Sequence, residues 1–231
     1  MPPALLAHLR RLYPAIALAA LVGGLPLALA SADGARMEEV ARARYGEAVA
    51  EAVRDWRTLL LGPDAVDEHE RLSRINTFFN RRLRFDDDIQ VWKEADYWAT
   101  PLETLARGAG DCEDFAIAKY ASLLAAGVPS ERLRLIYVRA RIGGPQSKLS
   151  QAHMVVGYYP TPDAEPLILD NLVSEIRPAG RRPDLFPIFS FTSEGLWVQG
   201  ANTSSADPTA RLSRWRSVLQ RMRAEGLDLQ Q

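Results

Sequence analysis

The chain has 231 residues and a formal net charge of −1, with 28 basic and 29 acidic side chains. This balance argues against a nucleic-acid-binding protein, which needs a surplus of lysine and arginine. One cysteine excludes an internal disulfide, so the hydrophobic core alone must hold the fold. The length suits one domain with a sizeable core.

The N-terminal 30 residues have the pattern of a secretory signal. Arg10 and Arg11 form a basic end, residues 12–29 are an apolar run, and Ala28-Leu29-Ala30 is a small-x-small cleavage site. If the segment is not removed, the same run is a single membrane anchor. We therefore expect an exported protein, in a bacterial periplasm, with one mature domain over residues 31–231. A lone exported thiol is open to oxidation, which favours a catalytic role for it.

Two helices are predicted at the start of the mature chain. Residues 31–34 are expected to be a linker. Apolar residues at helical spacing predict an amphipathic helix from Met37 to about Leu61, ended by Gly62-Pro63. A second helix is predicted from about Val66, with these residues inward: Leu72, Ile75, Phe78, Phe79 and Leu83.

A polar segment and a short helix follow. Residues 85–97 contain Asp86-Asp87-Asp88, which we expect to be a solvated turn because no spaced ligand set accompanies it. Thr100 and Glu103 then predict a capping box, with Pro101 at the first helical position.

The only cysteine lies at the predicted start of the next helix, in the stretch GAGDCEDF at 108–115. Asp111 is the predicted N-cap, and Asp114 completes a capping pattern. In the first helical turn, Cys112 faces unpaired backbone N–H groups and the positive end of the helix dipole, which favour the nucleophilic thiolate. The alternative is a small cysteine that simply fills the core.

Strands follow this helix. Segments at 133–138, 152–159, 166–172, 186–191 and 196–199 have strand character, and a last helix is predicted over about 208–225 after a loose linker. Helices followed by a meander of strands predict an α+β fold, with N-terminal helices packed on an antiparallel sheet.

A predicted hairpin brings a histidine and an aspartate together. If 152–159 pairs with 166–172, position 153 lies opposite about 171 or 172, so His153 and Asp170 become neighbours. Together with Cys112 they form a catalytic set in which the imidazole takes the thiol proton and the carboxylate orients the imidazole. The alternatives are a core histidine bonded to a backbone carbonyl and an aspartate that bonds its own turn.

The segments GDCEDFAIAKY, AHMVVGYY and LILDN resemble the bacterial transglutaminase-like cysteine proteinases, in particular the LapG-type periplasmic adhesin proteases. Trp92, YWATP and Ser190-Phe191 are also similar, and the resemblance runs from about Met37 to Leu196 without the last 30 residues. It implies a papain-like fold of transglutaminase type, with Cys112, His153 and Asp170 as the triad.

The same resemblance implies a substrate, a partner and a metal. The substrate is the N-terminal retention module of a large repeat-type biofilm adhesin, cut at a dialanine-containing site. An inner-membrane receptor for cyclic di-GMP sequesters the protease. Calcium binds beside the nucleophile, at the positions of Asp111 and Glu113. Unpaired carboxylates there disfavour a thiolate, and a cation reverses that field, although the acids also suit a helix start without metal.

Two questions stay open at this point. The same fold also serves transglutaminases and cell-wall peptidases, and a non-catalytic exported binding module with a structural cysteine is a further alternative. For the oxyanion hole, the backbone N–H of Cys112 is the natural first donor. The second donor is either a side chain near Trp98 or Gln151.

Overall fold

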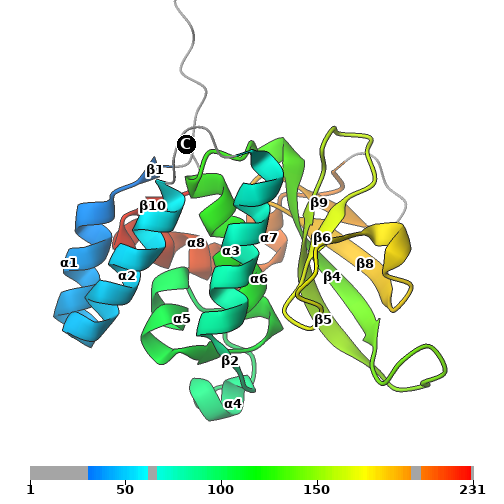
Figure 1. Ribbon diagram of the computed structural model, residues 1–231, viewed down its shortest axis with the longest axis horizontal. Helices are drawn as coiled ribbons and strands as arrows, with labels where there is room; N and C mark the ends of the chain where they lie inside the picture. Colours follow the sequence, from blue (N-terminus) through cyan, green and yellow to red (C-terminus); the bar gives the residue numbers. More distant parts are fainter. Residues whose placement is uncertain (1–30, 62–66, 199–203, 230–231) are drawn as a thin grey trace, which may run out of the picture.

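The computed structural model describes residues 31–61, 67–198 and 204–229. Over these ranges, helices lie on one side and a six-stranded antiparallel sheet on the other (Figure 1). The α+β prediction is confirmed. The expected signal segment and Gly62-Pro63 lie outside the described residues. Within those residues, no helix is long and apolar enough to cross a membrane.

The first predicted helix is two helices, so that prediction is wrong in one respect. Helices α1 (Gly34–Tyr45) and α2 (Glu47–Leu60) are separated by Gly46, whose φ is 91°. This left-handed conformation favours glycine and ends α1. The pair lies at the edge of the helical half of the molecule (Figure 1).

A series of helices and short strands precedes the cysteine. The predicted capping box is confirmed, because Thr100 Oγ1 accepts from the Glu103 N–H and Glu103 accepts from the Thr100 N–H. Strands β2 and β3 pair in parallel and tie the segment before α4 to the segment before Cys112. The elements are α3 (Glu68–Arg82), β2 (Arg84–Phe85), α4 (Asp88–Val91), α5 (Pro101–Arg107) and β3 (Ala109–Gly110).

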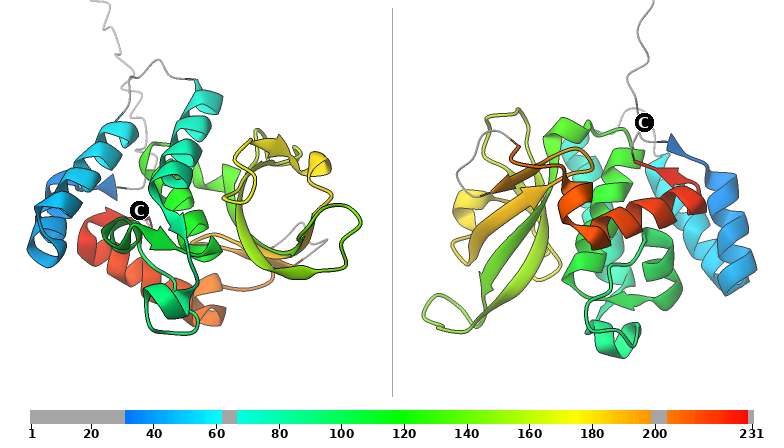
Figure 2. Two further views of the ribbon diagram at one scale, coloured as in Figure 1. Left: turned by 60° about the horizontal axis from the view of Figure 1, so that its bottom comes forward. Right: turned by 180° about the vertical axis from the view of Figure 1, so that it is seen from behind.

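Helix α6 (Cys112–Ala125) is the central element, lying between the other helices and the sheet (Figure 2). Nearly all of its residues are buried, as expected for a helix covered on every side. Trp56 Nε1 in α2 donates to Ser122 Oγ over 2.7 Å, and this hydroxyl donates to the Ala118 carbonyl over 2.6 Å. The cysteine therefore starts a firmly held helix.

The main sheet has the order β7-β6-β5-β4-β8-β9. Val156 lies opposite Leu169 and Tyr158 opposite Leu167. Continued along β5, this register puts position 153 opposite 172, as the predicted hairpin requires. The elements are η1 (Ser130–Arg132), β4 (Leu133–Arg141), β5 (Ser150–Tyr158), β6 (Leu167–Leu169), β7 (Arg177–Pro178), η2 (Ala179–Arg181), β8 (Leu185–Phe191) and β9 (Leu196–Val198).

The two faces of the sheet bury different clusters. Met154, Val156 and Leu169 belong to the main core with α6, whereas Val155 and Ile168 belong to a smaller second cluster. The sheet curls strongly, so that β6 and β7 turn back over β4 and β5 (Figure 2, left). The second cluster therefore lies on a concave face.

The C-terminal segment returns to the helical half. The predicted last helix is α7 (Pro208–Arg211) and α8 (Ser213–Glu225), interrupted at Leu212. Trp215 Nε1 donates to the Thr192 carbonyl over 2.9 Å, which ties α8 to the sheet. The expected N-terminal linker instead contains β1 (Ser31–Ala32), which pairs with β10 (Leu227–Asp228).

We predict that Ser122→Ala destabilises the protein by about 1–3 kcal/mol, because the buried Trp56 N–H loses its acceptor. Urea unfolding measures the effect. Ser73→Ala, at an exposed position of α3, is the matched control and should change the free energy of unfolding by less than about 0.5 kcal/mol. Equal effects of the two variants would contradict the role of the Trp56–Ser122 bond.

Candidate active site

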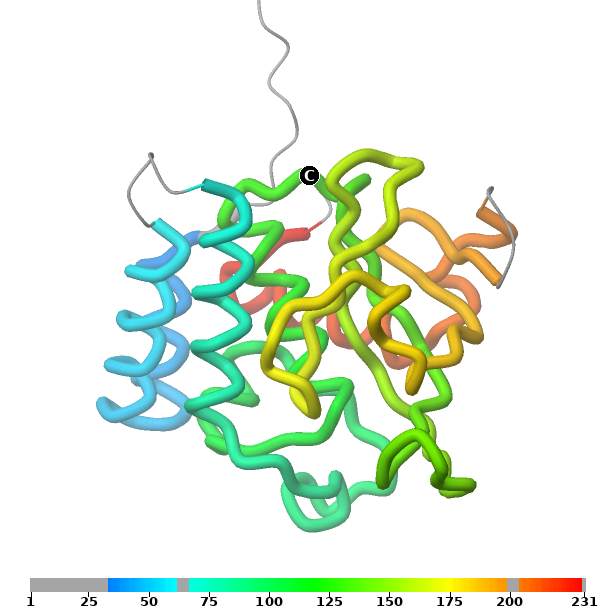
Figure 3. Tube along the Cα trace, turned by 45° about the vertical axis from the view of Figure 1, so that its right-hand side comes forward, coloured from blue at the N-terminus to red at the C-terminus, as the bar shows by residue number. Residues whose placement is uncertain are grey.

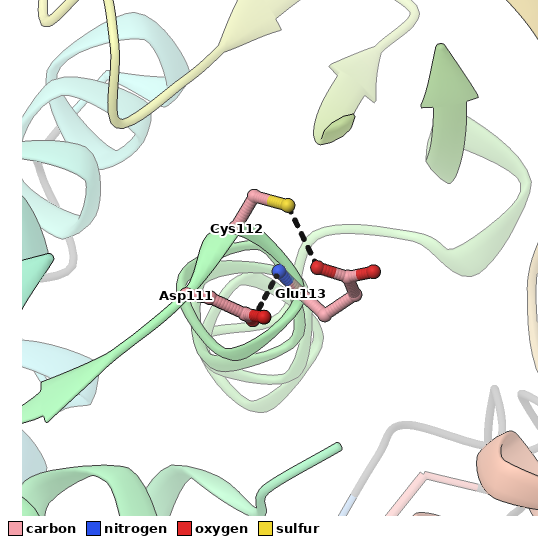
Figure 4. A group of neighbouring side chains, drawn as sticks. All are labelled: Asp111, Cys112 and Glu113. Atoms are coloured by element: carbon pink, nitrogen blue, oxygen red, sulfur yellow. Dashed lines mark hydrogen bonds between the residues drawn. The ribbon is translucent and has the colours of Figure 1, made fainter. Parts of the chain in front are cut away.

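Cys112 occupies the first position of α6, as predicted, and is 9% exposed. Asp111 is the N-cap, and its side chain accepts from the Glu113 N–H over 3.2 Å. The Cys112 thiol donates to Glu113 Oε2 over 2.7 Å (Figure 4). Glu113 therefore bonds directly to the thiol, and Asp111 in turn bonds to the backbone of Glu113.

The helix start is predicted to favour the thiolate, but burial and nearby negative charges outweigh this effect. Burial raises the pKa of Cys112 above its ordinary range, and the negative charges of Glu113 and Asp111 raise it further. A backbone hydrogen bond from Met154 acts in the opposite direction. That contact also places the sulfur beside β5, next to His153 in the chain.

His153 and Asp170 form the predicted pair. His153 Nε2 lies 2.8 Å from Asp170 Oδ1, and each residue is 1% exposed. His153 belongs to β5, and Asp170 follows the last residue of β6. The β5–β6 register produces this contact, so the three predicted catalytic residues come from a helix start, a strand and the end of the neighbouring strand.

Asp170 has further partners that sequence reasoning missed. Its Oδ2 accepts from Arg182 Nη2 over 2.7 Å, and its Oδ1 also accepts from the Leu172 N–H over 3.0 Å. Burial alone would raise the pKa of Asp170, but the bonds to His153, Leu172 and Arg182 outweigh it and lower the pKa to about 2. The carboxylate is thus held ionised.

Two residues from the helical half interact with Asp170, one by a hydrogen bond and one by its charge. Asn80 of α3 donates to the Asp170 carbonyl over 2.8 Å. Lys119 of α6 is 1% exposed, and burial lowers its pKa to about 7 while the charge of Asp170 raises it. No local sequence pattern indicates that a carboxylate lies near Lys119.

A cluster of carboxylates adjoins the cysteine. Oxygens of Asp88, Asp111 and Asp114 lie within 4.8 Å of one another, and a second group within the same limit joins Asp111, Cys112 and Glu113. Burial, together with neighbouring negative charges, raises the pKa of Asp88 and of Asp111 to about 7. Such a donor set suits a hard divalent cation.

Two expectations about these acids are wrong. Asp88 is 6% exposed rather than solvated: its Oδ2 accepts from the Tyr97 N–H, and its buried Oδ1 has no partner in the described part of the chain. Asp114 does not close the cap of α6, because its oxygens accept from Trp92 Nε1 and the Ala99 N–H. The β2–β3 pairing, which no local spacing signals, brings the segment of Asp88 here.

Gly110 is required by the position of Asp114. A Cβ at this residue would lie 2.4 Å from Asp114 Oδ2 and 2.7 Å from its Cβ. The glycine before the N-cap therefore allows the backbone to approach the buried carboxylate.

The candidates for the second oxyanion donor differ in burial. Gln151 is exposed. Trp98 is 8% exposed and stacks on Phe191, and its buried Nε1 has no partner among the described residues. Of the two, only Trp98 carries a buried donor without an acceptor.

Comparisons with known proteins agree with this geometry. The family model described as bacterial transglutaminase-like cysteine proteinase matches residues 55–199. Solved structures of Legionella pneumophila LapG, one EGTA-treated and one calcium-bound, are each 38% identical to the chain and cover 82% of it. They align over 97% and 98% of their own chains, with TM-scores of 0.71 and 0.70. No curated protein matches the chain.

We predict that Arg182→Gln destabilises the protein by about 3 kcal/mol or more, because it leaves the buried Asp170 carboxylate without its cation. The stabilisation from Asp170 is present above the ordinary carboxyl pKa and is lost only as pH falls through about 2. Urea unfolding at pH 7 and pH 5 should therefore show the same difference between parent and variant.

Arg177→Gln is the control for this prediction, because Arg177 pairs with Glu175 at the surface. Its loss should cost less than about 1 kcal/mol. A difference for Arg182→Gln that disappeared between pH 7 and pH 5 would assign the effect to a group other than Asp170.

Proposed function

The chain belongs to the bacterial transglutaminase-like cysteine proteinases, and we propose that it is a calcium-dependent periplasmic cysteine endopeptidase that cuts a large biofilm adhesin. The observation that carries this proposal is the buried His153–Asp170 bond beside the strand position that contacts the Cys112 sulfur. The similarity to LapG over most of both chains supports a protease of this family, and the adhesin substrate is what the resemblance of the sequence motifs implies.

The proposed reaction follows from the orientation of the pair. Because Nε2 of His153 is bonded to Asp170, Nδ1 is the nitrogen that takes the Cys112 proton. The thiolate sulfur then bonds to the scissile carbonyl carbon, and the same proton passes to the leaving amine as the peptide bond breaks. Water, losing a proton to His153, hydrolyses the thioester and releases the second fragment, and that proton restores the thiol.

Oxyanion stabilisation in this mechanism uses two N–H donors. The backbone N–H of Cys112 is the first, as the sequence predicts for a nucleophile at a helix start. We assign the second to Trp98 Nε1, which is buried and without an acceptor within the described ranges. The stacking of Trp98 on Phe191 fixes the indole plane.

Calcium fits the acidic cluster. The unpaired, buried Asp88 Oδ1 lies with Asp111 and Asp114 in a set of hard oxygen donors, and Glu113 adjoins it. We propose that Asp111 and Glu113, with Asp88, hold the ion and thereby fix the loop at the start of α6. When bound, the cation supplies positive charge that offsets the carboxylates around Cys112.

The proposed biological setting extends the same similarity. Residues 1–30 export the protease, which cuts the N-terminal retention module of a repeat-type adhesin and frees it from the cell surface. An inner-membrane receptor for cyclic di-GMP withholds the protease from the adhesin when the messenger is abundant.

We predict that residues 31–231 cut the N-terminal fragment of a large repeat-type adhesin from the same genome into two pieces, resolved by mass spectrometry. Cys112→Ala should abolish cleavage, and His153→Ala should slow it about 1,000-fold or more, because the base is lost. His69→Ala is the matched control and should cut normally, since His69 is exposed on α3. A crosslinked product in place of two fragments would identify a transglutaminase instead.

We predict that calcium binding raises the melting temperature. At a free calcium concentration of 100 times the dissociation constant, binding should add about 2.7 kcal/mol to the free energy of unfolding. Asp88→Asn keeps the oxygen that accepts from Tyr97 but loses a charge, so the calcium-induced shift should shrink. Asp87→Asn, at an exposed position, should keep it. A shift that is the same in both variants, or no shift in the parent with calcium against chelator, would refute the site.

A further inference from the structure

A cavity of about 340 Å³ lies on the concave face of the sheet. Figure 3 turns this half of the molecule toward the reader. The lining of the cavity is mostly apolar and includes Ile136, Val138, Val155 and Ile168 of the second cluster. Cys112 belongs to the main core on the opposite face, so the cavity is separate from the candidate active site.

One wall of the cavity carries a buried donor without an acceptor. Arg182 is 3% exposed, and its Nε and Nη2 donate to Asp184 and Asp170. Its Nη1 is buried and bonds to nothing in the described part of the chain. A buried guanidinium N–H without a partner is costly, so this position calls for an acceptor from a ligand.

A second arginine lines the cavity without a carboxylate partner. The Arg134 guanidinium carbon lies 4.1 Å from the ring centre of Trp197 and 5.1 Å from that of Tyr159. Within residues 31–61, 67–198 and 204–229, Arg134 makes no ion pair, and no aspartate or glutamate lines the cavity. Stacking on two rings orients the planar fork while its N–H edges stay available to an anion.

The two arginines are suited to different chemical groups of a ligand. Arg182 already faces two carboxylates, so its spare N–H suits a neutral acceptor. Arg134 suits a negative group. The sheet register separates them, because Arg134 pairs with Gly157, whereas Arg182 precedes Leu185, which pairs with Ala140 farther along β4. A ligand that meets both is therefore elongated.

We propose that the concave cavity binds an elongated amphiphilic organic monoanion, with its acid group at Arg134 and its apolar body among the second cluster. The size and apolar lining are those of ordinary small-molecule sites, which place a few polar groups in an apolar pocket. The proposal does not depend on the proposed proteolysis, since no residue of the triad lines the cavity.

The test uses 8-anilinonaphthalene-1-sulfonate, an aromatic monoanion that fluoresces in apolar sites, with the full chain. We expect saturable binding of one dye per chain and displacement by decanoate but not by decanol. Arg134→Gln should weaken dye binding about tenfold or more, the loss of a charge-assisted hydrogen bond. Arg139→Gln removes an exposed arginine from the same strand and should leave binding unchanged.

A second variant keeps the test decisive if Arg134→Gln does not fold. Ala179→Leu narrows the cavity from a half-buried position on η2, and it should also weaken the dye. Absence of saturable binding to the folded parent would overturn the proposal. So would equal losses in Arg134→Gln and Arg139→Gln, or displacement by decanol as strong as by decanoate.

Discussion

The buried carboxylate of Asp170 is the constraint on which this site depends. An ionised carboxylate that is almost fully buried is stable only when hydrogen-bond donors replace its hydrating water. Three donors do so here: His153, Arg182 and the Leu172 N–H. Each comes from a different part of the fold, since β5, η2 and the turn after β6 must all be in place. The imidazole is therefore oriented by the packing of the sheet and not by a local motif.

The acids around the cysteine show the opposite situation. Asp88, Asp111 and Asp114 are gathered with few cationic neighbours, and the result is raised pKa values where Asp170 has a lowered one. The carboxylates around the cysteine and the single carboxylate of Asp170 thus differ in whether a counter-charge is present. In the proposed enzyme, calcium supplies to the acids around the cysteine the positive charge that Arg182 supplies to Asp170.

Local chemistry explains which features were predictable. The Thr100–Glu103 capping box, Asp111 as the N-cap of α6 and the β5–β6 hairpin depend on neighbouring residues, and the sequence predicted them. Asp88 and Arg182 were missed because a parallel β2–β3 pairing and a turn after β7 bring them in from a distance. The break between α1 and α2 at Gly46 was not predicted because the apolar periodicity continues on both sides of this residue. The helix ends there because of the positive φ of Gly46.

Arg182 lies across the boundary between the two faces of the sheet. One nitrogen of its guanidinium donates to Asp170, and the same residue lines the concave cavity. A rigid planar group cannot adjust one edge without turning the other. If the proposed ligand shifts Arg182, occupancy of the cavity and the orientation of Asp170 are linked thermodynamically, and by reciprocity a state of the triad that moves Arg182 changes the affinity of the cavity by the same factor.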